Sequence, residues 1–169
     1  MTGRPAAFLD RDGVLIEDSG YPHRPEHLKL IPGAAAAVRR MNQAGYRTVI
    51  VTNQSGVARG LFSEETMNAF NDLLVARLAE EGAIIDAVYS APFHPEAIEA
   101  RYRHPDHPDR KPNPGMLLRA IAEHDLDPTQ SFIIGDQKRD LQAGERAGVA
   151  GYLFEGGDLD AFVRDVVGL

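Results

Sequence analysis

The order of apolar segments along this chain restricts its fold more than any other feature. Five short apolar runs alternate with longer stretches of helical periodicity. Strands that alternate with helices form right-handed β-α-β units and a sheet covered on both faces. The sequence therefore predicts an α/β fold of three layers, with a doubly wound and mainly parallel sheet. The expected strands, nearly all apolar as parallel strands usually are, are residues 6–10, 46–53, 87–91, 131–136 and 151–154.

The stretches between these strands carry the signals that begin and end helices. Ser63 stands where a capping side chain is expected, and Gly82 follows the same stretch at its other end. Pro114 occupies a position that suits the first residue of a helix. Helices are expected over residues 33–45, 63–82, 113–125, 138–148 and 158–169.

The length of 169 residues fits one domain with one substantial core. We expect this domain to occupy residues 1–169, with a loop insert at 92–112 and without a separate cap domain. The loop at 13–30 is also longer than such a fold needs. Long loops in compact domains are usually functional or disordered.

Composition excludes several classes of protein. The net charge of −7 argues against a partner made of nucleic acid. Cysteine is absent, which excludes disulfides and cysteine-ligated zinc and is compatible with a reducing compartment. The chain lacks an apolar run long enough to span a bilayer. We therefore expect a cytoplasmic protein without a membrane partner, and a monomer.

Two aspartates separated by one residue, Asp10 and Asp12, end the first predicted strand. In doubly wound folds, ligands bind at the carboxyl ends of the strands. A strand order of 3-2-1-4-5 would place Thr52 and Asp136 on either side of Asp10. Three carboxylates at one edge of the sheet repel one another unless a cation is present. Because oxygen ligands without His or Cys favour Mg²⁺, the sequence predicts a magnesium site formed by Asp10, Asp12 and Asp136.

Four motifs in this order resemble those of the haloacid dehalogenase superfamily of phosphatases. They are FLDRDGV at the first strand, VIVTN at the second, Lys111, and IIGDQKRD at the fourth. The resemblance covers residues 8–150. Four segments point to a smaller family within this superfamily: DRDGV, GY at 20–21, VTNQSGVARG at 51–60 and RKPNPGM at 110–116. These segments are similar to those of the D-glycero-D-manno-heptose 1,7-bisphosphate phosphatases, and much of the pattern is shared with the histidinol-phosphate phosphatases.

The resemblance implies a role for each of the motif residues. Asp10 would be the nucleophile that forms an aspartyl-phosphate. Asp12 would protonate the leaving alkoxide and then activate water. The side chains of Asp10 and Asp136 and the backbone carbonyl of Asp12 would hold Mg²⁺. Thr52 and Lys111 would neutralise charge on the phosphoryl oxygens.

The resemblance also implies a small phosphorylated sugar as the substrate, and the best match is removal of the 7-phosphate from heptose 1,7-bisphosphate. A capless site of this kind would take its specificity from the loops 17–27, 54–62 and 92–112. Arg59 is a candidate for the distal phosphate, and Asp140 is expected to order a metal-bound water or to cap the following helix. The other expected substrate contacts are Asp18, Ser19, Gly20, Tyr21, Asn53, Gln54, Ser55 and Arg110.

The chain departs from this family in two places. Gln137 follows the fourth-motif aspartate, where the family often has a basic residue. Many heptose-bisphosphate phosphatases also fold the loop before the catalytic lysine around zinc, with three cysteines and one histidine. The loop contains His94, His104 and His107. We expect these histidines to lie at the surface and the loop to bind no zinc. The residues at the zinc-ligand positions are Ala91, Phe93, His107 and Asp109.

Two other interpretations remain open. One is a histidinol-phosphate phosphatase, or a phosphatase of another small phosphometabolite. The other belongs to a different class, a receiver-like signalling module that stores a phosphoryl group on an aspartate. Receivers lack an acid two residues after the phosphate acceptor, so Asp12 favours an enzyme with turnover.

Overall fold

The centre of the fold is a sheet of five parallel strands. The computed structural model describes residues 3–169. The strands are β1 (Ala6–Leu9), β2 (Arg47–Asn53), β3 (Ala87–Ala91), β4 (Phe132–Gly135) and β5 (Ala150–Leu153). Their order is β3-β2-β1-β4-β5, and every neighbouring pair is parallel. This is the predicted order and class, so the fold prediction is confirmed.

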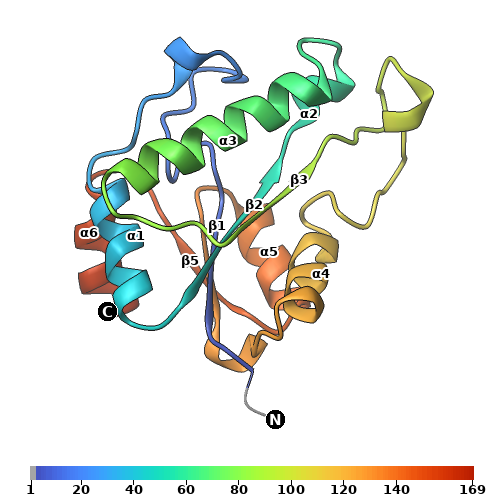
Figure 1. Ribbon diagram of the computed structural model, residues 1–169. Helices are drawn as coiled ribbons and strands as arrows, with labels where there is room; N and C mark the ends of the chain where they lie inside the picture. Colours follow the sequence, from blue (N-terminus) through green and yellow to red (C-terminus); the bar gives the residue numbers. More distant parts are fainter. Residues whose placement is uncertain (1–2) are drawn as a thin grey trace.

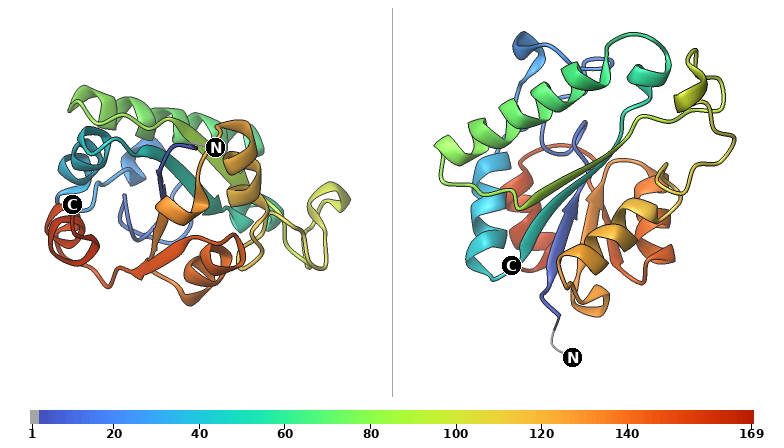
Figure 2. Two further views of the ribbon diagram at one scale, coloured as in Figure 1. Left: turned by 90° about the horizontal axis from the view of Figure 1, so that it is seen from below. Right: turned by 45° about the vertical axis from the view of Figure 1, so that its right-hand side comes forward.

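Helices cover both faces of the sheet (Figures 1 and 2). The alternation of side chains along β1 fixes the two layers. Ala7 and Leu9 pack in one core with α1, α3 and α6, whereas Ala6 and Phe8 pack in a second core with α4 and α5. The helices are α1 (Ala34–Gln43), α2 (Ser55–Ala58), α3 (Glu64–Glu80), α4 (Gly115–Glu123), α5 (Lys138–Arg146) and α6 (Leu159–Phe162).

The helix ends agree with most of the sequence signals. Ser63 caps α3, since its hydroxyl oxygen accepts a hydrogen bond from the backbone N–H of Thr66 at 3.1 Å. Pro114, expected as the first helical residue, lies one position before α4 instead. Pro114 is the capping residue: its ψ of 9° is not helical, and its carbonyl accepts the first bond of the helix, from the N–H of Leu118 at 2.9 Å. The predicted helix at 158–169 is also interrupted, because α6 ends at Phe162 and continues as a π-helical segment.

Two long loops leave the carboxyl edge of the sheet. The chain between β1 and α1 contains one short 3₁₀ turn, Pro25–His27, and the chain between β3 and α4 contains another, Ala100–Tyr102. Within residues 3–169, neither connection forms a separate folded cap.

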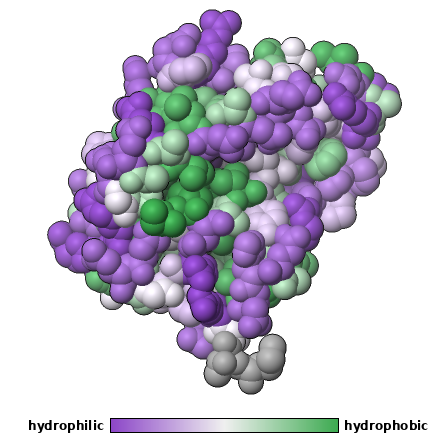
Figure 3. Space-filling view, viewed as in Figure 1, coloured by the Kyte–Doolittle hydropathy of each residue, from purple (hydrophilic) through white to green (hydrophobic). Residues whose placement is uncertain are grey.

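The face seen in Figure 1 is mostly hydrophilic, and its largest hydrophobic area lies beside α3 (Figure 3). In the described part of the chain, the helices are too short or too polar to cross a membrane.

Candidate active site

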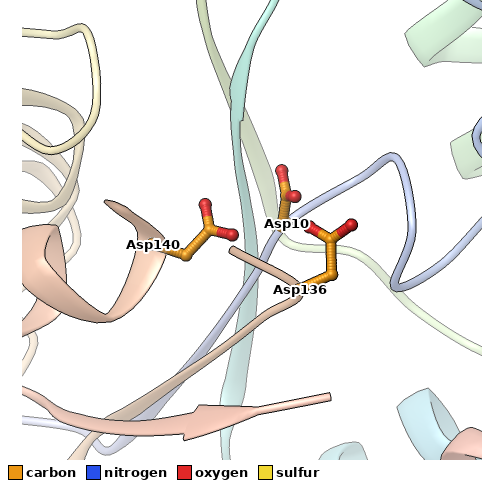
Figure 4. Close-up of side chains that lie close together, drawn as sticks. All are labelled: Asp10, Asp136 and Asp140. Carbon is orange, nitrogen blue, oxygen red and sulfur yellow. The ribbon is translucent and has the colours of Figure 1, made fainter. Parts of the chain in front are cut away.

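Three aspartates meet at the carboxyl edge of the sheet. Asp10 follows β1, Asp136 follows β4, and Asp140 lies in the first turn of α5. Each offers a carboxylate oxygen, and these oxygens all lie within 4.8 Å of one another (Figure 4). Gly13 allows the chain to turn beside them, because it has a φ of +88° and a Cβ there would lie 2.1 Å from Oδ2 of Asp136. The adjacency of β1 and β4 thus creates the acidic group.

Charge in this group is not balanced by the protein alone. The pKa of Asp10 is raised to about 8: burial is the largest cause, Lys111 acts in the opposite direction, and the charges of Asp140 and Asp12 add to the rise. A buried carboxyl group with such a pKa resists ionisation unless a cation compensates. Closely spaced carboxylate oxygens are the donors that Mg²⁺ prefers. The residues present therefore fit a magnesium ion.

The membership of this group differs from the expectation in one respect. Asp140 supplies the third carboxylate, whereas the carboxylate of Asp12 pairs with Arg11 at 2.6 Å. The Asp12 carboxylate is held outside the group of three aspartates, because Arg11 donates two N–H groups to it. A contact between the backbone carbonyl of Asp12 and a metal stays a prediction.

Lys111 supplies the positive charge at the centre of the site. Its ammonium donates to Oδ1 of Asp10 at 3.0 Å and to the carbonyl of Val51 at 2.8 Å, and it lies 2.6 Å from Oδ1 of Asp140. Burial lowers the pKa of Lys111, but the charges of Asp10 and Asp140 outweigh this effect and the pKa is raised. Lys111 therefore remains a cation although its side chain is only 1% exposed.

Asn53 fixes the backbone of Lys111. The N–H of Lys111 donates to Oδ1 of Asn53 at 2.9 Å, and Nδ2 of Asn53 donates to the carbonyl of Lys111 at 3.1 Å. These two bonds connect the end of β2 to the loop that carries the lysine. The side chain of Asn53 is thus used by the protein, and its expected contact with substrate stays a prediction.

A cleft of about 370 Å³ opens onto this acidic group. Ser19, expected as a substrate contact, is exposed and lies outside the described lining of the cleft. Gln137 and Arg139 line the cleft although neither was predicted as a contact. For Arg139, its place inside the fourth motif, three residues after Asp136, was the available signal. The other predicted residues all line the cleft: Asp10, Asp12, Asp18, Gly20, Tyr21, Thr52, Asn53, Gln54, Ser55, Arg59, Arg110, Lys111 and Asp136.

Three arginines, Arg59, Arg110 and Arg139, line the same cleft. Burial lowers the pKa of Arg110, and the charges of Arg139 and Arg59 lower it further. The Nε atom of Arg110 is buried and has no hydrogen-bond partner among residues 3–169. Converging guanidinium groups with a free donor are suited to bind an anion such as phosphate.

Side chains of the loop before Lys111 contact one another and α4. The rings of Phe93 and His107 stack with centroids 3.5 Å apart, and Asp109 forms an ion pair with Arg119. Nδ1 of His107 also accepts the N–H of Asp109 at 3.0 Å. Three of the four positions that the sequence comparison assigned to zinc ligands therefore make protein contacts here. That the loop binds no zinc remains a prediction.

Family models match both halves of the chain. Residues 7–91 match the model described as haloacid dehalogenase-like hydrolase, and residues 109–161 match a HAD-hydrolase-like model. The first match spans β1 to β3 and the second spans β4 and β5. The chain belongs to the haloacid dehalogenase-like hydrolases.

Individual relatives agree with this assignment. The hydrolase is 47% identical to the D-glycero-β-D-manno-heptose-1,7-bisphosphate 7-phosphatase of Rhodopseudomonas palustris, over 97% of this chain and 91% of the relative. A HAD-like phosphatase from Mesorhizobium loti superposes with a TM-score of 0.87 at 44% identity, covering 92% of this chain and 74% of that one.

A third relative was crystallised with ligands. The D,D-heptose 1,7-bisphosphate phosphatase of B. bronchiseptica, complexed with magnesium and phosphate, superposes on this hydrolase with a TM-score of 0.78 at 37% identity. The match covers 92% of this chain and 83% of that one.

Proposed function

We propose that this chain removes the 7-phosphate from D-glycero-D-manno-heptose 1,7-bisphosphate in a magnesium-dependent reaction. One observation carries the proposal: a single cleft holds acids that suit a cation and arginines that suit an anion. A bisphosphate needs both sites: the cation at the acids for the phosphate that reacts, and the arginines for the phosphate that stays on the product. The names of the relatives that match most of the chain point to the same substrate.

Asp10 is the proposed nucleophile. Because Lys111 holds Oδ1 of Asp10, Oδ2 is the atom that attacks phosphorus. A bond forms between Oδ2 and phosphorus, and the bond from phosphorus to the sugar oxygen breaks. Asp12 gives a proton to that oxygen, so the sugar leaves as an alcohol and Asp10 carries the phosphoryl group.

Hydrolysis of the aspartyl-phosphate restores the enzyme. Water attacks phosphorus while Asp12 takes the proton of the water, and the bond to Oδ2 of Asp10 breaks to release inorganic phosphate. Thr52 and Lys111 donate to the phosphoryl oxygens. The hydroxyl oxygen of Thr52 accepts a hydrogen bond from Nε2 of Gln54 at 2.9 Å, and the hydroxyl itself makes only a long contact, 3.5 Å, with the carbonyl of Asn53, which a phosphoryl oxygen would replace. Magnesium held by the acids would neutralise charge on the transferred group.

The three arginines are the proposed site of the phosphate that remains on the product. A dianionic phosphate would pair with Arg59 and Arg139 and would satisfy the free Nε of Arg110. This arrangement favours a bisphosphate over histidinol phosphate, whose amine is cationic and would be repelled. We also propose that the enzyme acts as a monomer, since the residues of one chain are enough to form the described cleft; the cytoplasmic location stays a prediction.

A substrate panel tests the proposal. Mg²⁺-dependent phosphate release should be measured with α- and β-heptose 1,7-bisphosphate, fructose 1,6-bisphosphate and histidinol phosphate, with Asp10→Asn as the inactive control. We expect kcat/KM for one heptose anomer to reach about 10⁴ M⁻¹s⁻¹ or more and to exceed the other values at least tenfold. Phosphorus NMR should show that the 1-phosphate is retained. Equal, slow hydrolysis across the panel would contradict the proposed substrate.

A further inference from the structure

Arg11 is a buried charge that the reaction scheme leaves unused. Side chains alternate along β1, with Ala7 and Leu9 facing the layer that contains α3. Arg11 takes the next position on that side, where its guanidinium lies 4.7 Å from the ring centre of Phe70 in α3. The side chain of Arg11 is 1% exposed. Among residues 3–169, it is not part of the cleft lining.

The guanidinium holds both oxygens of the Asp12 carboxylate. Nε of Arg11 donates to Oδ1 at 2.6 Å and Nη2 donates to Oδ2 at 3.3 Å. Asp12 is the one carboxylate that Arg11 contacts within the described chain. The Asp12 side chain is 20% exposed and lines the cleft. Arg11 therefore connects the buried interior to a carboxylate that faces the substrate.

Neutral partners from three other segments fix the guanidinium itself. Nη1 donates to Oδ1 of Asn71 in α3 at 2.9 Å. Nη2 donates to the carbonyl of Pro22, in the loop after β1, at 3.0 Å and to Oε1 of Gln54, after β2, at 3.1 Å. The guanidinium group of Arg11 is planar, and its neutral partners hold that plane in place. Its two N–H groups therefore fix the orientation of the Asp12 carboxylate.

We propose that Arg11 is a positioning residue for the acid: its short bond holds Oδ1 of Asp12, so that Oδ2, whose contact with Nη2 is long, carries the proton that passes to the leaving group. This inference rests on the proposed acid-base role of Asp12. A residue that serves only the fold would affect every substrate alike. A residue that positions the acid matters most where the leaving group needs a proton. Sugar alkoxides need one, whereas p-nitrophenolate leaves without it.

The test compares these two leaving groups in the phosphorylation step. Arg11→Met removes the fork, Arg11→Lys keeps the charge, and Asp12→Asn is the benchmark. Single-turnover rates should be measured with p-nitrophenyl phosphate and with the sugar phosphate that the panel shows to be hydrolysed fastest. Arg40→Met is a matched control, because Arg40 also holds a carboxylate, that of Asp160, and belongs to no proposed machinery.

For Arg11→Met we expect the phosphorylation rate with the sugar phosphate to fall about 30-fold or more, which is part of the roughly 10²–10⁴-fold that general acid catalysis contributes. KM and the p-nitrophenolate burst rate should change less than about threefold. Arg11→Lys should recover part of the loss. Asn71→Leu, which removes one anchor of the guanidinium, should show the same pattern more weakly. If Arg11→Met does not fold, the same comparison of the two leaving groups is made with Asn71→Leu.

Equal losses with both leaving groups in the Arg11 variants would overturn the inference, as would a pattern no different from Arg40→Met. The benchmark separates the two possible failures. If Asp12→Asn shows the leaving-group dependence and the Arg11 variants do not, Arg11 has no positioning role and the proposed acid stands. If Asp12→Asn lacks the dependence, the proposed role of Asp12 fails, and the inference about Arg11 fails with it.

Discussion

The ammonium of Lys111 lies 2.6 Å from the carboxylate of Asp140, and both side chains are 1% exposed. Asp140 also caps α5, because its Oδ2 accepts the N–H of Gln137 at 3.0 Å. One side chain thus fixes both the start of a helix and the position of the proposed catalytic lysine. The expected cap is present, and the expected role in ordering a metal-bound water stays a prediction.

Removing the lysine should affect stability as well as turnover. Lys111→Gln leaves Asp10 and Asp140 buried without their cation, which typically costs about 3–5 kcal/mol. We expect a drop of this size in the unfolding free energy of the metal-free protein, measured by urea denaturation, and loss of activity. Lys138→Gln, an exposed neighbour on α5, should change neither. An unchanged unfolding free energy in Lys111→Gln would mean that the ion pairs contribute little.

Substitution of the nucleophile should remove the response to metal. Asp10→Asn replaces a buried acid whose ionisation is already unfavourable without a metal, so the metal-free variant should be at least as stable as the wild type. Magnesium should raise the melting temperature of the wild type through mass action and should have a much smaller effect on the variant. Thermal melts with Mg²⁺ and with a chelator measure this difference. An equal magnesium shift in both proteins would exclude Asp10 as a ligand.

The distal phosphate site should depend on Arg139. Loss of a charge-assisted hydrogen bond costs about 1.5–3 kcal/mol. Arg139→Gln should therefore raise KM for the bisphosphate about tenfold or more and leave KM for a heptose 7-monophosphate unchanged. Lys138→Gln is the neighbouring control, since Lys138 is not among the described residues of the cleft lining. Equal increases in KM for both substrates would place Arg139 elsewhere in binding.

Zinc should not be needed by the loop before Lys111. Phe93 and His107 stack on each other, and Asp109 pairs with Arg119, so three of the corresponding zinc-ligand positions already have partners. Elemental analysis of protein purified without added metal should find far less than one zinc per chain. Activity lost to a chelator should return with Mg²⁺ alone. Stoichiometric zinc, or a requirement for zinc in recovery, would contradict this prediction.

The pair between α1 and α6 should make stability depend on pH. A hydrogen bond from Arg40 lowers the pKa of Asp160. A carboxylate with a lowered pKa stabilises the fold above its unfolded pKa of about 3.9, and this contribution disappears as the pH falls through the folded pKa. Asp160→Asn should cost up to about 1 kcal/mol at pH 7.

The difference between Asp160→Asn and the wild type should shrink as the pH falls below about 4. Urea denaturation of both proteins at pH 7 and at a pH below about 4 measures this difference in unfolding free energy. Asp72→Asn is the control, because Asp72 is an exposed carboxylate on α3. A loss in Asp160→Asn that did not change with pH would show that the side chain acts through packing.

The strand order and the meeting of Asp10 with Asp136 could be predicted from the sequence, because both follow from β-α-β geometry and from where the apolar runs end. The role of Arg11 could not. Its partners Gln54 and Asn71 are distant in sequence, and their approach depends on how α3 packs. A charged residue between two acids is indistinguishable in sequence from a solvated spacer. The pairing of Asp140 with Lys111 was missed for the same reason.

The order of the strands also has a consequence during synthesis. β1 is made first, but it lies between β2 and β4, and the pair formed by Asp10 and Lys111 joins residues 101 positions apart. A chain interrupted before β4 therefore has an open hydrogen-bonding edge on its central strand and lacks Asp136 and Asp140. Catalytic competence thus arises only late in translation, and incomplete chains present a sheet edge prone to association.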